Sequence, residues 1–208
     1  EGQRYSTKGY EVILIGHEGH PEVVGTMGRI SGDVYLVSNT DDVKKLEVKN
    51  SSKLSYISQT TLSVDDTRVV IEALKDRFPL IEGPDVKDIC YATQNRQSAV
   101  RDLVDHVNLI LVVGAKNSSN SNRLRDLGEE SGVDTFLIET ADDLDRKWFN
   151  NVDSIGISSG ASTPDELVKE VMNRISTFRE IKIETRPGIK ENVVFKLPKE
   201  LEKYHVAG

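Results

Sequence analysis

The stretch LILVVG, residues 109–114, decides the fold, because five apolar residues in a row end at a glycine. A short apolar run with a turn residue at its end is typical of a strand buried on both faces of a parallel sheet. The same pattern occurs about 100 residues earlier as VILIG, residues 12–16. Two such strands at corresponding positions predict two copies of one α/β unit.

Other segments repeat at the same spacing. The predicted strand that ends at Val37 and the one that ends at Ile138 are each followed by a pair of aspartates, and predicted helix starts at Ser63 and Thr163 also correspond. Self-similarity at a fixed period is the signature of an internal repeat. Each copy therefore contains three strands with flanking helices.

The predicted fold class is α/β, with two pseudo-symmetric three-layer modules built on mostly parallel sheets. The first module is expected at residues 1–84 and the second at 85–180, because a Gly-Pro turn signal separates them. A charged C-terminal tail follows at 181–208, with an edge strand expected at 192–195.

Composition narrows the class of protein. The 208 residues are 37% hydrophobic and 29% charged, with a net charge of −7 spread along the chain. This balance is typical of a soluble globular protein and argues against general binding to nucleic acid or to an anionic membrane. The sequence contains no run of about 18 apolar residues, so it predicts no membrane span. A single cysteine excludes a disulfide framework and fits a reducing compartment.

That cysteine, Cys90, lies between a turn at residues 82–85 and a predicted helix. Backbone N–H groups and the helix dipole favour a thiolate at such a position, so Cys90 is a candidate metal ligand or nucleophile. The simpler interpretation is a small buried hydrophobe. By the symmetry of the repeat, the counterpart of Cys90 falls before Glu1, so a longer chain is expected to carry a second cysteine.

Polar loops follow the predicted strands, at the edge where parallel α/β sheets bind ligands. His20 and Glu22 follow the first strand. A protonated histidine can bind phosphate, and a carboxyl group with a raised pKa can relay protons. The alternative is an exposed polar turn.

A second polar loop, NSSNSN at residues 117–122, precedes a predicted helix. Its hydroxyls and amides, together with free helix N–H groups, make a candidate anion cradle, although the glycine and lysine spacing of a Walker loop is absent. Thr60 and Ser162 follow other strands and would border the same pocket. Each of these residues taken alone is more typical of a helix cap, and Thr93 is predicted to cap the helix after Cys90.

Taken together, five segments resemble the LytB family, the 4-hydroxy-3-methylbut-2-enyl diphosphate reductases. They are HEGHPE at 17–22, QTTLS at 59–63, ICYAT at 89–93, KNSSNSNRL at 116–124 and GAS at 160–162. No segment is specific alone, but the set spans nearly all of the chain.

This resemblance implies three pseudo-symmetric α/β modules around a [4Fe-4S] cluster that three cysteines hold, with one iron open to substrate. The implied reaction is reductive dehydroxylation of 4-hydroxy-3-methylbut-2-enyl diphosphate to isopentenyl and dimethylallyl diphosphates, the last step of the non-mevalonate isoprenoid pathway. The implied electron donor is a protein such as ferredoxin or flavodoxin. The expected location is the bacterial cytoplasm or, in a plastid-bearing organism, the stroma.

The resemblance also assigns roles to residues. It implies that Cys90 is the last of the three cluster ligands, that Glu22 relays protons to the substrate, and that Thr60 contacts the substrate hydroxyl or its proton network. The implied diphosphate contacts are His20, Ser118, Ser119, Asn120 and Ser162.

The departure from the family is large, because its N-terminal module and the other two cysteines have no counterpart in these 208 residues. One thiolate cannot hold a cubane cluster, so we expect an N-terminally truncated form that is inactive, lacks a stable cluster and associates with itself through the uncovered face. Two other functions stay open: a redox-inert α/β protein that binds or hydrolyses a phosphate ester, and a protein-interaction module.

Overall fold

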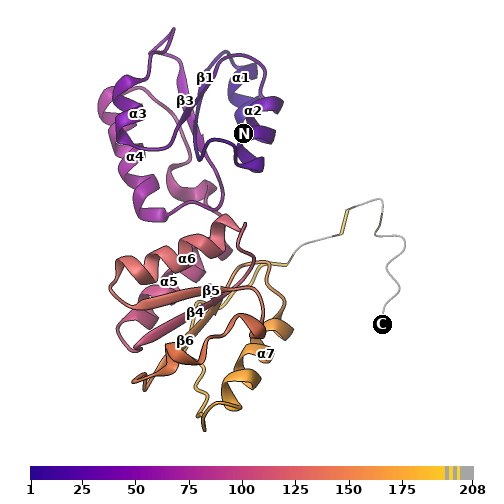
Figure 1. The fold of residues 1–208 in the computed structure, drawn as a ribbon. Coiled ribbons are helices and arrows are strands. Elements are labelled where there is room, and N and C mark those ends of the chain that lie inside the picture. Colours follow the sequence, from indigo (N-terminus) through magenta and orange to yellow (C-terminus); the bar gives the residue numbers. More distant parts are fainter. Residues whose placement is uncertain (195–196, 199–200, 202–208) are drawn as a thin grey trace.

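The computed structural model describes residues 1–194, 197–198 and 201, and it contains two three-stranded parallel sheets (Figure 1). The first sheet has the order β2-β1-β3 and the second the order β5-β4-β6, so the two share one topology. The strands are β1 (Glu11–Ile15), β2 (Val34–Val37), β3 (Leu54–Ser58), β4 (Leu109–Val113), β5 (Asp134–Ile138) and β6 (Ile155–Ser159). The expected α/β class and the internal repeat are both confirmed.

Helices cover both faces of the first sheet. Alternate residues of a strand point to opposite faces, so Ile13 and Ile15 pack towards α3 and α4 while Val12 and Leu14 pack towards α1 and α2. The central strand is therefore apolar at every position except its first. The helices are α1 (Gly2–Thr7), α2 (Pro21–Arg29), α3 (Thr40–Lys45) and α4 (Val64–Arg77).

The second sheet is covered in the same way. Ile110 and Val112 pack towards α5 and α6, on the side that faces the first module, while Leu109 and Leu111 pack towards α7 on the far side (Figure 1). None of the helices in the described ranges is long and apolar enough to cross a bilayer. The helices of this part are η1 (Asp85–Asp88), α5 (Tyr91–Val104), α6 (Ser119–Glu130), η2 (Ala141–Asp143), η3 (Arg146–Phe149) and α7 (Asp165–Ser176).

Three local expectations were wrong. Helix α6 begins at Ser119, inside the expected loop. Cys90, and not Thr93, caps α5, because the backbone turns into the helix before Thr93 is reached. In the tail, residues 192–194 form no strand, and Phe195 lies outside the described residues.

The segment before Cys90 packs on the first module. Glu82 bridges to Ser55 of β3, and the Asp88 carboxylate accepts a hydrogen bond from the Ser58 N–H at 3.0 Å. Ile89 is 1% exposed within the first core. The expected boundary at residue 84 stays a prediction, and these contacts favour a boundary at Cys90.

Candidate functional site

The ends of the first sheet bring three of the predicted site residues into one hydrogen-bonded chain. Glu22, in the first turn of α2, accepts the Thr60 N–H through Oε1 at 2.9 Å. The Thr60 carbonyl in turn accepts the Cys90 N–H at 3.0 Å. A carboxylate, a hydroxyl residue and a thiol from three separate elements are thus fixed relative to one another by backbone groups.

His20 is the N-cap of α2, and its Nδ1 accepts the Glu22 N–H at 3.2 Å. A neutral ring that accepts at Nδ1 carries its proton on Nε2, so the assigned tautomer leaves Nε2–H as a donor. The side chain is half-buried beside Glu22. This arrangement suits a donor to an anionic ligand.

Gln59 connects the two modules, and sequence reasoning gave it no role. Its side chain is 1% exposed, and Nε2 lies 3.0 Å from Thr61 Oγ1 and 3.3 Å from Ser119 Oγ. Its Oε1 accepts the His17 N–H at 3.1 Å. The sequence signal for Gln59 is a polar residue directly after an apolar strand. This pattern is too common to identify Gln59 as a functional residue.

The start of α6 presents polar groups at the ends of β4 and β6. Ser118 caps the helix by accepting the Ser121 N–H at 3.2 Å. Asn120 is 5% exposed, and neither its amide oxygen nor its amide nitrogen finds a hydrogen-bond partner in the described part of the chain. A buried amide without partners is costly, so a polar ligand at this helix start would satisfy it.

Two glycines allow this helix to approach the sheet. A side chain on Gly114, after β4, or on Gly160, after β6, would overlap with Ser121 Oγ. The same contact places the turn that contains Ser162 beside α6, with Ser162 itself exposed. Arg96 of α5 donates from Nε to the carbonyl of Ser159, the last residue of β6, at 3.0 Å and holds the strand end just before this turn.

A cavity of about 700 Å³ opens between the modules. Of the predicted site residues, His20 and Ser119 line it, and Glu22, Thr60 and Cys90 lie outside its lining. The cavity therefore lies on one flank of the Thr61–Ser119 contact. Its other walls are the first turns of α4 and α6 and the residues before α3.

Titratable groups anchor the segment that leads to Cys90. Burial raises the pKa of Asp88, although its bond from the Ser58 N–H acts in the opposite direction. The hydrogen bond from Lys75, at 2.5 Å, lowers the pKa of Asp85, and a second bond from the Tyr56 hydroxyl acts in the same direction. These contacts fix the backbone just before the cysteine.

The half-buried Cys90 thiol points back over the first turn of α5. Its Sγ lies 3.4 Å from the Thr93 nitrogen and 3.2 Å from Thr93 Oγ1. No group of three or more His, Cys, Asp or Glu side chains that could hold a metal occurs among the described residues. An iron–sulfur cubane normally takes three or four protein ligands, so these residues do not by themselves form a cluster site. Cys90 can contribute one thiolate.

The LytB protein family model matches residues 1–176. This chain belongs to the LytB family. The assignment agrees with the resemblance found in the sequence and with the repeated α/β modules.

Relatives within the LytB family are identical to this chain at about half of the aligned positions. It is 53% identical over 204 residues to the 4-hydroxy-3-methylbut-2-enyl diphosphate reductase of Pseudoalteromonas translucida (strain TAC 125), across 97% of the chain and 66% of the relative. It is 55% identical over 199 residues to the enzyme of the same name from Acidithiobacillus ferrooxidans (strain ATCC 53993 / BNL-5-31), across 95% of the chain and 63% of the relative. The chain thus spans slightly less than two thirds of the length of these curated relatives.

Solved structures agree with the LytB fold. The E-1-hydroxy-2-methyl-but-2-enyl-4-diphosphate reductase from Plasmodium falciparum superposes with a TM-score of 0.90 at 36% identity, across 97% of this chain and 64% of that chain. A second structure, of (E)-4-hydroxy-3-methyl-but-2-enyl diphosphate reductase, superposes with a TM-score of 0.50 at 32% identity.

Proposed function

We propose that this chain forms two modules of a 4-hydroxy-3-methylbut-2-enyl diphosphate reductase. In that reaction two electrons and two protons enter the substrate, its C–O bond breaks, and the hydroxyl group leaves as water to give isopentenyl or dimethylallyl diphosphate. The observation that carries the proposal is the hydrogen-bonded chain from Glu22 through Thr60 to Cys90. It supports the proposal because a carboxyl group that can carry a proton and a thiol that can bind a metal lie near one sheet edge. Relatives that align with most of this chain bear this name.

We propose that the diphosphate binds at the start of α6. Helix N–H groups attract anions, and Ser118, Ser119 and Asn120 add polar groups to them. His20 Nε2 would donate from the first module and Ser162 from the turn after β6. The net charge of −7 does not oppose this binding, because the donors are local.

We propose that Glu22 passes protons to the substrate and that Thr60 orients the leaving hydroxyl group. The Thr60 N–H donates to the Glu22 carboxylate and holds it at the site. The Thr60 hydroxyl group belongs to the same residue and is therefore attached beside this contact. A general acid must lie within hydrogen-bond reach of the proton's destination, and this anchoring restricts where the carboxyl group can lie.

We further propose that the remaining cluster ligands come from outside these 208 residues, because Cys90 is their single cysteine. A bound cluster would supply the electrons, which a ferredoxin or flavodoxin would deliver to it. We use the term complete reductase for this chain together with the protein that supplies those ligands. The 208-residue chain alone is expected to hold less than stoichiometric iron after anaerobic reconstitution and to show no reductase activity.

The test compares variants of the complete reductase in substrate reduction and in pyrophosphate binding. Cys90→Ser is expected to abolish reduction yet to fold, because a serine oxygen can accept the Thr93 N–H as the helix cap. Glu22→Gln is expected to lower kcat by about 10²–10⁴-fold with little change in pyrophosphate affinity. Glu166→Gln, an exposed glutamate in the first turn of α7, is the matched control and should change neither.

Two outcomes would contradict the proposal. Full reduction by Cys90→Ser would exclude the thiol as a required ligand. Tight pyrophosphate binding by a complete reductase that reduces no substrate would favour a redox-inert phosphate-ester-binding protein instead.

A further inference from the structure

We infer that Gln97 is a positioning residue, which holds the Thr60–Leu62 loop of one module in register with the site groups of the other. This inference rests on the proposed function. Gln97 lies on α5 and is fully buried, with 0% of its surface exposed. Sequence reasoning gave it no role of its own.

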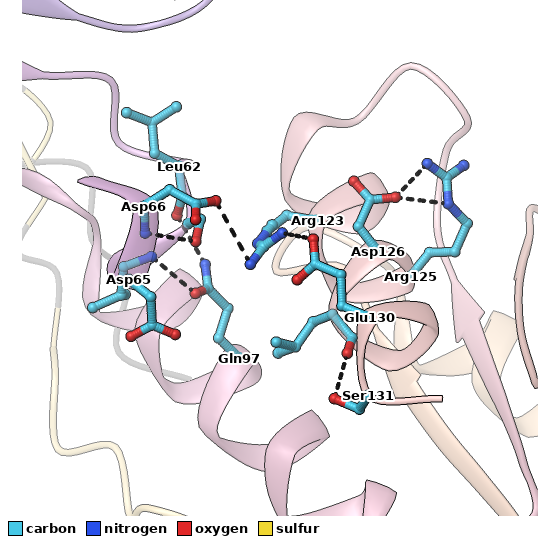
Figure 2. Close-up of polar contacts among 12 residues, drawn as sticks. Leu62, Asp65, Asp66, Gln97, Arg123, Arg125, Asp126, Glu130 and Ser131 are labelled. Carbon is cyan, nitrogen blue, oxygen red and sulfur yellow. Dashed lines mark hydrogen bonds and ion pairs between the residues drawn. The ribbon is translucent and has the colours of Figure 1, made fainter. Parts of the chain in front are cut away.

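The side-chain amide of Gln97 makes two hydrogen bonds to the backbone of the first module (Figure 2). Its Nε2 donates to the Leu62 carbonyl at 2.8 Å, and its Oε1 accepts the Val64 N–H at 3.2 Å. These two backbone groups lie on either side of Ser63, the N-cap of α4. A neutral amide can donate and accept at once, so Gln97 clamps the chain where the loop turns into the helix.

The clamped loop carries two further contacts between the modules. Thr60, two residues before Leu62, accepts the Cys90 N–H, and Ser119 Oγ lies 3.4 Å from the Thr61 carbonyl. A shift of Leu62 would therefore move Thr60 relative to Cys90. It would not move the start of α6, because α5 and α6 pack on the same face of the second sheet.

Charged pairs surround the clamp but are more exposed than it is. Arg101 of α5 lies 2.5 Å from Asp65, and Arg123 of α6 lies 3.8 Å from Asp66, both at the start of α4 (Figure 2 shows the second pair). The Arg101–Asp65 pair is exposed and contributes little, and Asp66 of the second pair is exposed although Arg123 is not. A buried amide that is removed, in contrast, leaves backbone groups unsatisfied. Gln97 is therefore the buried side chain of α5 that holds this loop in register.

The test uses Gln97→Met in the complete reductase, since methionine has a similar shape and no hydrogen-bonding amide. The variant is expected to lose kcat on the order of 100-fold, because a small misplacement of reacting groups is enough for such a loss. Its pyrophosphate Kd and its iron content are expected to stay within about twofold of the unmodified protein. Arg101→Ala, which removes the neighbouring exposed ion pair, is the control and should keep kcat within about twofold.

A second variant separates positioning from a general loss of structure. In Gln97→Glu the protonated carboxyl group can donate to Leu62 and accept from Val64 as the amide does, but the carboxylate cannot donate. The charged groups near it are Asp65 and Asp66 from α4, Arg101 from α5 and Arg123 from α6. The kcat of this variant relative to the unmodified protein is expected to rise as pH falls from about 8 to about 6.

The inference is overturned if Gln97→Met keeps kcat within twofold, or if its kcat, pyrophosphate affinity and iron content fall together. If Gln97→Met does not fold, a flat kcat ratio for Gln97→Glu across the pH range overturns it. Failure of the proposed function looks different, because the unmodified complete reductase would then reduce no substrate.

Discussion

At the scale of single residues, the sequence singled out Cys90 correctly as a thiol at a helix start. The structure adds that Cys90 itself is the cap of α5 and that its N–H is bound to Thr60. Neither fact could be predicted from the sequence. Serine, threonine and asparagine are among the commonest N-cap residues, so Thr93 was the expected N-cap of α5. The Asn120 amide, which has no hydrogen-bond partner among the described residues, could not be foreseen either, since burial depends on how closely α6 approaches the sheet.

Asp88 gives a pH dependence at this scale. Burial raises its pKa, so the folded protein holds the proton more tightly than the unfolded chain. Its contribution to stability is thus present below the unfolded pKa of about 3.9 and is lost as pH rises through the folded pKa. We expect Asp88→Asn, whose amide oxygen can still accept the Ser58 N–H, to raise the free energy of unfolding at neutral pH. Because the group is partly exposed, the gain should be below about 1 kcal/mol.

Urea denaturation near neutral pH and again towards about pH 4 measures this effect, and the gain should shrink at the lower pH. Asp76→Asn, at an exposed position of α4, is the control and should show no such trend. A variant at Asp88 that is less stable than the unmodified chain at neutral pH would show that the carboxylate is favourable there.

At the scale of elements, the strands were the predictable part. Continuous apolar runs ending in glycine identified β1 and β4, because both faces of these strands are buried. The start of α6 was not predictable, since the hydroxyl and amide residues of its first turn favour loops as much as caps. Helix α1 was missed because just one of its residues, Gly2, is buried, so it has no apolar stripe.

The close approach of α6 to the second sheet leads to a prediction at this scale. Gly114→Ala is expected to destabilise the chain by about 1–3 kcal/mol, because the added methyl group would overlap with Ser121 Oγ. Combining it with Ser121→Ala should recover part of the loss. Gly25→Ala is the control, since it adds the same methyl group to α2 in open space and should stabilise by about 0.5–1 kcal/mol. Urea denaturation measures all three, and equal stability of Gly114→Ala and the unmodified chain would contradict the close approach.

At the scale of the whole molecule, each module has apolar clusters on both faces of its own sheet, and polar contacts through Gln59, Gln97 and the start of α6 join the modules. The internal repeat revealed the two modules because each strand and helix leaves its own local hydrophobic pattern in the sequence. The side-chain hydrogen bonds of Gln59 and Gln97 between the modules join residues 33 to 60 positions apart and leave no periodic pattern in the sequence. Their geometry was therefore beyond sequence reasoning.

The boundary between the modules gives the last prediction. If the first module extends to Ile89, a chain of residues 1–89 should be more stable than one of residues 1–84 by at least about 2 kcal/mol, because the shorter chain loses the buried Ile89 side chain. It also loses the bond from the Ser58 N–H to Asp88. Ile89→Ala in the longer chain should remove most of the difference, which separates burial of this side chain from chain length. Urea denaturation of the three proteins measures their free energies of unfolding. Equal stability of residues 1–84 and 1–89 would favour a module boundary at residue 84.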